Sequence, residues 1–266
     1  MGKRIGVGIL LALLVVAMLM VGPPLLIPVF TLGAVIAVYE LSNAFAAKDY
    51  RPFMAPAFVF AALYPVFAFF LPEISLMALW MVCVLAVIAD RVLSHIRKTE
   101  EAFLALTPFV YPLPFFAVLL LLYHDLGQAQ GTVAMLLAFA CPLMGDSFAY
   151  FIGTLFGKHK LNTELSPKKT VEGSIASVFG SLAAAVIIYF LQPLWGTAVP
   201  ALPLLLLGFV CGFLGQLGDL FASAVKRWAG IKDFGTIFPG HGGVMDRVDS
   251  VLLCAPAAYL CFYLLQ

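Results

Sequence analysis

Acidic, basic and hydroxyl side chains recur at a helical spacing near the end of the chain. Asp219, Ser223, Lys226 and Arg227 stand at positions i, i+4, i+7 and i+8. If a helix runs through them, it places an acid, a hydroxyl and two bases on one face. A carboxylate beside two cations is a combination that can bind a divalent metal ion and phosphate groups together.

A glycine-rich loop and a second pair of carboxylates follow this segment. Residues 239–243 include three glycines, whose backbone N–H groups an anion can approach closely. His241 in this loop is a candidate proton donor or phosphate ligand, or it simply caps the turn. Asp246 and Asp249 stand at i and i+3, so they share a face at the start of the next helix.

The types of these residues favour chemistry on phosphate groups. Mg²⁺ prefers oxygen ligands and is usually held by one or two carboxylates together with the phosphates of a substrate. Residues 166–174 add the adjacent Lys168 and Lys169 and several hydroxyl groups. We interpret this segment as a second phosphate-binding loop, and the alternative is a solvated loop whose lysines only set the membrane topology.

Two further acids lie in otherwise apolar stretches. Ionisable side chains are costly inside a membrane, so Glu40 and Asp146 are candidate functional residues. Both are expected within one or two helical turns of the membrane surface, as is Asp219, and the three could converge on one cavity. The alternative is that each bonds to a neighbouring helix or extends to the interface.

Several other kinds of site are not supported. The sequence has no P-loop, no dinucleotide-binding glycine motif and no His-Glu-x-x-His motif. Its four histidines are too dispersed for a zinc site, and its five cysteines all stand in apolar runs, where we interpret them as small apolar side chains.

Composition shows where these residues must be held. Of the 266 residues, 63% are hydrophobic and 11% charged, and the mean hydropathy is +1.06, so water is not the main solvent of the chain. Stretches of about 20 apolar residues are long enough to cross a bilayer as helices. We predict an all-α integral membrane protein with about nine transmembrane helices, near residues 5–22, 24–45, 53–70, 73–90, 102–122, 131–153, 174–191, 201–222 and 250–265.

The basic residues set the predicted orientation. With nine spans, all fifteen lysines and arginines fall at the N-terminus or in segments 46–52, 91–101, 154–173 and 223–249, all on one side. The positive-inside rule makes that side the cytoplasm, with the N-terminus cytoplasmic and the C-terminus outside. We predict an N-terminal transmembrane region (residues 1–130, about five spans) and a C-terminal catalytic region (131–266, about four spans with cytoplasmic loops 154–173 and 223–249).

The segment from 223 to 249 resembles a known signature. The pattern Ser223-x2-Lys226-Arg227-x4-Lys232-Asp233-Phe234-Gly235-x3-Pro239-Gly240-His241-Gly242-Gly243-x2-Asp246-Arg247-x-Asp249 is similar to that of the phosphatidate cytidylyltransferases, also called CDP-diacylglycerol synthases. Asp146 with Tyr150 and Gly153, and residues 166–170 with Glu172 and Gly173, also resemble this family. The first half of the chain resembles it only in having several spans and, at most, in Glu40.

The resemblance implies an enzyme, a nucleotidyltransferase that transfers a cytidylyl group from CTP to phosphatidic acid and releases pyrophosphate. It implies a requirement for a divalent metal, usually Mg²⁺, bound as one ion or as more than one. It also implies a role in phospholipid biosynthesis. It also implies a plasma (inner) membrane location with the active site facing the cytoplasm, and a homodimer. CTP, phosphatidic acid and membrane lipid are the expected partners, and nucleic acid is not.

The roles of the candidate residues follow as hypotheses. Metal binding is assigned to Asp219, Asp246 and Asp249, with Asp146 as a further ligand. The catalytic residues are the same three aspartates, Asp219, Asp246 and Asp249, together with Lys226. Contacts to the substrates are assigned to the remaining residues: Ser223, Arg227, Lys168, Lys169, His241, Gly242, Gly243 and Arg247.

Two rival functions remain. Another lipid-linked enzyme, such as a CTP-using polyprenol kinase or an archaeal-type CDP-lipid synthase, would share much of the chemistry, and the lipid tail of the acceptor is not encoded in these motifs. A transporter coupled to protons would need acids near the middle of the membrane and two related halves. The acids here are predicted at one surface, and the sequence shows no repeat.

Overall fold

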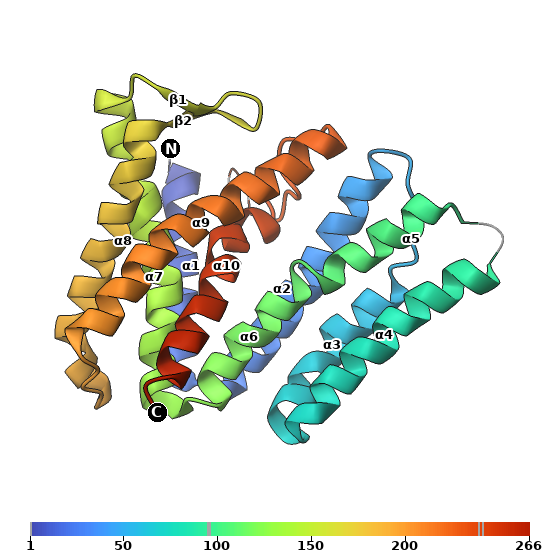
Figure 1. Cartoon of the computed structure of the whole chain (residues 1–266), viewed down its shortest axis with the longest axis horizontal. Helices are drawn as coiled ribbons and strands as arrows, with labels where there is room; N and C mark the ends of the chain where they lie inside the picture. Colours follow the sequence, from blue (N-terminus) through green and yellow to red (C-terminus); the bar gives the residue numbers. More distant parts are fainter. Residues whose placement is uncertain (1, 95–96, 239, 241) are drawn as a thin grey trace. The chain divides into compact units, whose positions relative to one another are not determined.

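The computed structural model describes residues 2–94, 97–238, 240 and 242–266 and is almost entirely helical (Figure 1). The elements of the first half are α1 (Gly2–Val21), α2 (Pro23–Ala46), α3 (Ala55–Phe70), α4 (Glu73–Leu93), α5 (Thr99–Leu106), η1 (Thr107–Phe109) and α6 (Leu113–His124). Those of the second half are α7 (Gly127–Phe156), β1 (Lys160–Asn162), β2 (Ser166–Thr170), α8 (Val171–Leu191), η2 (Gln192–Trp195), α9 (Ala201–Ala229) and α10 (Met245–Tyr263).

The chain packs into two compact units. Unit 1 consists of Met1–Leu120 together with Trp228–Arg247, and unit 2 consists of Leu121–Arg227 together with Val248–Gln266. Unit 1 therefore takes in the loop that precedes α10 as well as the first helices. The division of function predicted at residues 130 and 131 stays a prediction.

The all-α membrane character of the chain is confirmed. Six helical segments among the described residues are long and apolar enough to cross a membrane, and two shorter apolar helices cover Leu10–Val21 and Ala55–Phe70. α10 is a helix as predicted, but it carries Asp246, Arg247 and Asp249 near its start and is not one of the six. The total of nine spans and their orientation stay predictions.

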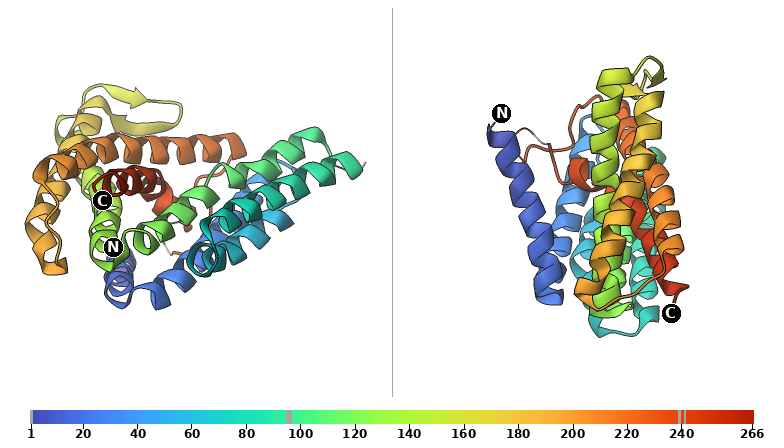
Figure 2. Two further views of the ribbon diagram at one scale, coloured as in Figure 1. Left: turned by 60° about the horizontal axis from the view of Figure 1, so that its bottom comes forward. Right: turned by 90° about the vertical axis from the view of Figure 1, so that its left-hand side faces the viewer.

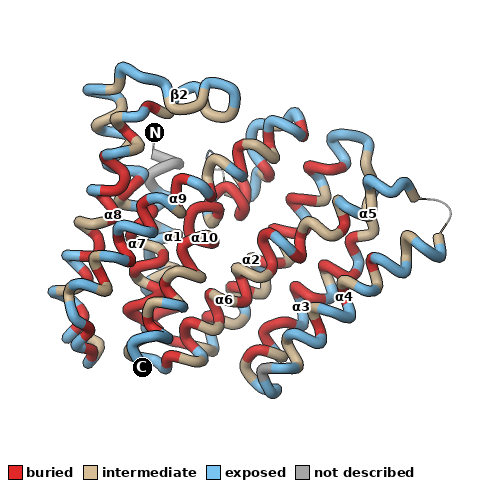
Figure 3. Tube along the Cα trace, viewed as in Figure 1, coloured by how far each residue is buried: buried red, intermediate tan, exposed pale blue. Residues whose placement is uncertain are grey.

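One face of α4 shows how unit 1 is suited to lipid. Ile74, Met77, Met81, Leu85 and Ile88 recur every three or four residues and are 45–71% exposed. Figure 3 shows α4 mostly in the colours of exposed and intermediate residues. A continuous apolar stripe of this kind is unfavourable in water and matches a helix that faces acyl chains.

Small residues bring the helices of unit 2 together. A β-carbon added at Gly145 would lie 2.9 Å from the Ser181 hydroxyl oxygen, and one added at Gly212 would lie 2.8 Å from the Val178 α-carbon. The Ser181 hydroxyl also donates a hydrogen bond to the Cys141 carbonyl at 2.8 Å. Small residues and interhelical hydrogen bonds of this type are common where membrane helices pack closely.

The predicted cytoplasmic loop 154–173 contains a short β-hairpin. β1 and β2 pair antiparallel, with Lys160 opposite Thr170 and Asn162 opposite Ser166. The hairpin lies across the ends of α7 and α8 in Figure 1. The prediction for this segment was a loop, because the sequence carries no alternating apolar pattern there.

Candidate active site

The predicted polar face of α9 is present. α9 continues without a break to Ala229, so Asp219, Ser223 and Lys226 lie along one side of a single helix. Ser223 is 8% exposed and Lys226 is 9% exposed, whereas Arg227 is exposed. Since a buried ammonium group needs polar or anionic partners, this side of α9 belongs to an internal charged site.

Three carboxylates of unit 2 form the centre of this site. Asp249 on α10 is 6% exposed and lies within electrostatic range of Asp219, Asp146 and Lys226. One oxygen of Asp249 accepts a hydrogen bond from the Ser250 backbone N–H at 2.7 Å. We call Asp146, Asp219 and Asp249 the carboxylate cluster; they come from α7, α9 and α10.

Close packing of α9 against α10 brings two of these acids together. The two helices run side by side in both views of Figure 2. A β-carbon at Gly218 would lie 2.3 Å from the Asp249 carbonyl oxygen and 3.1 Å from the Ser250 α-carbon. Gly218 thus permits a backbone-to-backbone contact at the level of Asp219 and Asp249.

Lys169 supplies a second cation to the cluster. Its ammonium group forms an ion pair with one carboxylate oxygen of Asp219, and both side chains are part-exposed. Lys168, the neighbour of Lys169 on β2, is exposed. Because successive side chains of a strand point to opposite faces, one lysine reaches the cluster and the other faces away from it.

Local hydrogen bonds hold the hairpin that carries Lys169. The Asn162 side-chain oxygen accepts from the backbone N–H groups of Glu164 at 3.1 Å and Leu165 at 3.0 Å, which closes the turn. At the other end, the Thr170 hydroxyl caps α8 by accepting from the Gly173 N–H at 3.1 Å.

Gln216 is a further buried polar residue of this region, beyond the candidates named from the sequence. Its side-chain nitrogen donates to the Ser174 carbonyl at 3.2 Å and to the Gly212 carbonyl at 2.6 Å. The Ser174 hydroxyl in turn donates to the Gln216 side-chain oxygen. The contact ties the start of α8 to α9 one turn before Asp219. The sequence signal was an amide inside an apolar span.

The segment between α9 and α10, residues 230–244, belongs to unit 1, and we call it the signature loop. Asp246 holds this loop by hydrogen bonds to its backbone. Its Oδ2 accepts hydrogen bonds from the backbone N–H groups of Phe234 at 2.8 Å and Gly243 at 2.9 Å. Gly242 adopts a positive φ of 84° beside the same carboxylate, a conformation that favours glycine. The predicted approach of a phosphate to Gly242 and Gly243 stays a prediction, and the Gly243 N–H is bonded to Asp246 in this structure.

The remaining predicted residues are distributed as follows. Arg247 is exposed in the first turn of α10. His241 lies outside the described residues. Glu40 lies in unit 1, where it contacts the signature loop, while Asp146 and Asp219 are together in unit 2.

The donor set of the carboxylate cluster fits a hard divalent cation. Carboxylate oxygens are the ligands that Mg²⁺ prefers, and Mg²⁺ usually keeps several waters and gains further ligands from substrate phosphates. In the part of the chain that the structure describes, no three His, Cys, Asp or Glu side chains form a ready-made metal site. A site completed by the substrate is compatible with that finding.

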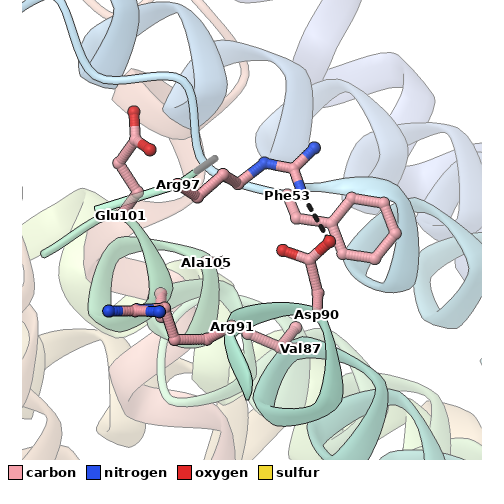
Figure 4. Close-up of a pocket in the computed structure, with 8 residues that line it drawn as sticks. Phe53, Val87, Asp90, Arg91, Arg97, Glu101 and Ala105 are labelled. Atoms are coloured by element: carbon pink, nitrogen blue, oxygen red, sulfur yellow. Dashed lines mark hydrogen bonds and ion pairs between the residues drawn. The ribbon is translucent and has the colours of Figure 1, made fainter. Parts of the chain in front are cut away.

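A separate charged group lies at the ends of α4 and α5. Figure 4 shows the Arg97 guanidinium paired with Asp90 and placed over the Phe53 ring, 4.9 Å from its centroid. Glu101 accepts a hydrogen bond from the Arg51 backbone N–H at 2.8 Å. These contacts join the segment before α3 to the turn before α5, and they account for this group as a structural one.

Comparison with known proteins then identifies the family. The family model described as "Cytidylyltransferase family" matches residues 2–265, nearly the whole chain. The chain belongs to the cytidylyltransferase family. Within that family, the match covers α1 through α10, so it includes both the carboxylate cluster and the signature loop.

Curated relatives from three bacteria illustrate the similarity. A protein of Thermotoga maritima named phosphatidate cytidylyltransferase is 34% identical over 244 residues, which cover 87% of this chain and 85% of the relative. Proteins of the same name from Synechocystis sp. and Bacillus subtilis are each 44% identical, over 144 and 123 residues. Those two matches span about half of the relatives, 47% and 45% of their lengths. The long apolar helices, together with relatives whose name refers to a membrane lipid, show that the chain is an integral membrane protein.

Proposed function

We propose that this chain transfers a cytidylyl group from CTP to phosphatidic acid, giving CDP-diacylglycerol and pyrophosphate. Membership of the cytidylyltransferase family and the Thermotoga relative support this nucleotidyl transfer. The structural observation that carries the proposal is the Lys169–Asp219 ion pair together with Asp249 and Lys226, which lie within electrostatic range of each other near the end of α9.

The reaction needs charge neutralisation more than it needs a base. The second pKa of a phosphate monoester is about 6, so the phosphate of phosphatidic acid already carries an ionised oxygen near neutral pH. That oxygen forms a bond to the α-phosphorus of CTP, the bond between the α- and β-phosphates breaks, and pyrophosphate leaves. The barrier to this step comes mainly from bringing two polyanions together, and fixed cations lower it.

Lys169 and Lys226 are placed to provide those cations. The ammonium group of Lys169 is held beside the cluster by Asp219, and Lys226 lies in electrostatic range of Asp249. When a phosphate takes the place of the Asp219 carboxylate beside Lys169, the lysine exchanges one anionic partner for another without leaving the site. Ser223, Arg227 and Arg247 are the further phosphate ligands of the proposal.

Asp219 and Asp249 would hold Mg²⁺, with Asp146 as a neighbouring carboxylate; the metal-binding role predicted for Asp246, which belongs to unit 1, stays a prediction. The bound metal would neutralise charge on the triphosphate. The Lys169 ammonium group, paired with Asp219, offsets part of the negative charge of the cluster.

The membrane orientation of the proposal follows from the distribution of charge. All fifteen lysines and arginines lie in segments assigned to one side of a nine-span topology. This distribution supports a plasma-membrane enzyme whose active site faces the cytoplasm, the compartment that contains CTP. We further propose that two copies associate and that the chain has no nucleic-acid partner. Native mass spectrometry of detergent-purified protein tests the dimer, and a monomer at micromolar concentration would exclude a stable one.

The activity is tested with purified protein in detergent, labelled CTP, Mg²⁺ and phosphatidic acid. We expect a labelled CDP-lipid and one equivalent of pyrophosphate, both dependent on Mg²⁺. A matched Asp219→Asn variant should lose both products while keeping the elution volume and thermal stability of the wild type. Folded wild-type protein that gives no CDP-lipid would overturn the proposal.

A second arm separates the rival acceptors. The same assay with a polyprenol or polyprenyl phosphate in place of phosphatidic acid should give no labelled lipid. A phosphorylated polyprenol formed with release of CDP would identify a kinase instead. The same assay with an archaeal-type ether-linked phosphatidic acid as the acceptor measures whether the enzyme prefers ester-linked or ether-linked lipid tails.

A further inference from the structure

Glu40 is an acidic residue buried in the interior of unit 1. It stands on α2, far from the catalytic motifs in sequence, and it is only 1% exposed. Its Oε1 accepts a hydrogen bond from the Val244 backbone N–H at 2.9 Å, and its Oε2 accepts one from the Met245 N–H at 2.8 Å. Both oxygens of the carboxylate therefore bind the backbone at the point where α10 begins.

The position of this carboxylate suits the start of a helix. The first N–H groups of a helix have no partner within it, and the N-terminus carries a partial positive charge. Met245 is the first residue of α10, and Val244 precedes it directly. Glu40 thus supplies from another helix the acceptor that a capping side chain usually supplies locally.

Two glycines of the signature loop close around the same carboxylate. A β-carbon at Gly243 would lie 2.1 Å from Oε1 of Glu40, and one at Gly235 would lie 2.3 Å from that oxygen. Neither glycine has a positive φ, so any side chain there is excluded by lack of space and not by the backbone conformation. Glu40 is consequently the nearest group that a side chain at either position would meet.

Asp246 shares this loop with Glu40. The Gly243 N–H donates to Asp246 while the Gly243 α-carbon faces Glu40. Asp246 also binds the Phe234 N–H, and the two carboxylates lie within electrostatic range of each other. Glu40 and Asp246 therefore bind neighbouring N–H groups of the same stretch of backbone, those of residues 243–245.

We propose that Glu40 is a positioning residue for the cytidylyl transfer, acting through the signature loop and the start of α10 without touching either substrate. By fixing the Val244 and Met245 N–H groups, it sets where α10 begins and thereby where Asp246 and Asp249, one turn apart on that helix, are presented. This inference rests on the proposed function, because the residues that it positions are those assigned to the metal and phosphates.

The test is a double-mutant cycle between Glu40 and Gly243, in the detergent assay described above. Glu40→Gln keeps the size of the side chain but turns an amide N–H₂ toward one of the two backbone donors. We expect kcat to fall about 10- to 100-fold, with the KM values for CTP and phosphatidic acid changed less than about threefold. We expect a similar fall for Gly243→Ala in the wild-type background.

The second half of the cycle separates the proposed contact from a general loss of fold. Glu40→Ala removes the carboxylate that the Gly243→Ala methyl group would meet, so the double variant should be no less active than Glu40→Ala alone. A further fall of the same factor in the double variant would overturn the proposal. So would a Glu40→Gln variant with wild-type kcat, or one in which only a KM rises.

Hydrogen exchange gives a readout that does not depend on catalysis. Peptides that cover Val244 and Met245 should exchange faster in Glu40→Gln than in the wild type, while peptides from α8 should exchange equally in both. Unchanged exchange at 244 and 245 would overturn the proposal even if activity falls. Absence of product with wild-type protein would instead reject the proposed function. The exchange experiment would then still test the contact between Glu40 and the N–H groups of Val244 and Met245.

Discussion

The contact between α9 and α10 at Gly218 yields a quantitative prediction. In Gly218→Ala, the new methyl carbon would lie 2.3 Å from the Asp249 carbonyl oxygen, which belongs to the backbone and cannot rotate away. Non-bonded heavy atoms prefer separations of about 3.5 Å, so the two helices must move apart by about 1 Å. That movement separates Asp219 from Asp249 directly.

The expected consequences follow from this displacement. A misplacement of about 1 Å in a catalytic arrangement can cost about 100-fold in rate, so we expect kcat of Gly218→Ala to fall about 100-fold. Overpacking of a helix contact typically costs about 1–3 kcal/mol, so the variant should melt at a lower temperature but remain folded. The assay is CDP-lipid formation by purified protein at saturating CTP and Mg²⁺.

Two matched glycine variants give the prediction a scale. A β-carbon at Gly215, one turn earlier on α9, would lie 3.0 Å from a side-chain carbon of Pro142, and one at Gly8 would meet nothing within 4 Å. Gly215→Ala should therefore lose less activity than Gly218→Ala, and Gly8→Ala should lose none. If folded Gly218→Ala keeps more than half of the wild-type kcat, the assignment of Asp219 and Asp249 to one site is refuted.

Three further predictions concern single side chains. Asp219→Asn should lower CDP-lipid formation about 100-fold or more at the Mg²⁺ concentration that saturates the wild type, and an unchanged rate at that concentration would argue against its proposed role as a metal ligand. Lys169→Gln should lower kcat/KM for CTP about 10- to 100-fold because a charged contact to phosphate is lost, and Lys168→Gln should lower it less, so equal losses would contradict the alternation along β2. Tyr259→Phe removes a 2.6 Å hydrogen bond to Asp125 and should cost about 1–3 kcal/mol of stability without changing kcat, as judged by thermal unfolding and the CDP-lipid assay.

The sequence was sufficient for features that depend on local periodicity. Apolar runs of the right length predicted the helical membrane architecture, and a spacing of three and four residues predicted the polar face of α9. Asp219 and Asp249 could be proposed together because both stand at the predicted membrane surface on consecutive spans. Their proximity in unit 2 agrees with that proposal.

The contacts that were not predicted join residues distant in sequence. The alternation of side chains along β2 places Lys169 and not Lys168 beside Asp219, and no apolar pattern in the segment reveals which side chains face α9. The sequence leaves three alternatives for Glu40: it bonds to a neighbouring helix, extends to the interface, or converges with Asp146 and Asp219. Its actual partners are backbone N–H groups more than 200 residues later, and backbone groups leave no signature in sequence.

The discontinuity of unit 1 limits how this enzyme family can be recombined. Met1–Leu120 folds with Trp228–Arg247, so the helix that carries Glu40 and the loop that carries Gly235 and Gly243 are complementary parts of one unit. A chimaera that exchanges only the first 120 residues with a relative would pair a carboxylate from one parent with glycines from another. Functional chimaeras should therefore require both segments from the same parent, although more than 100 residues separate them along the chain.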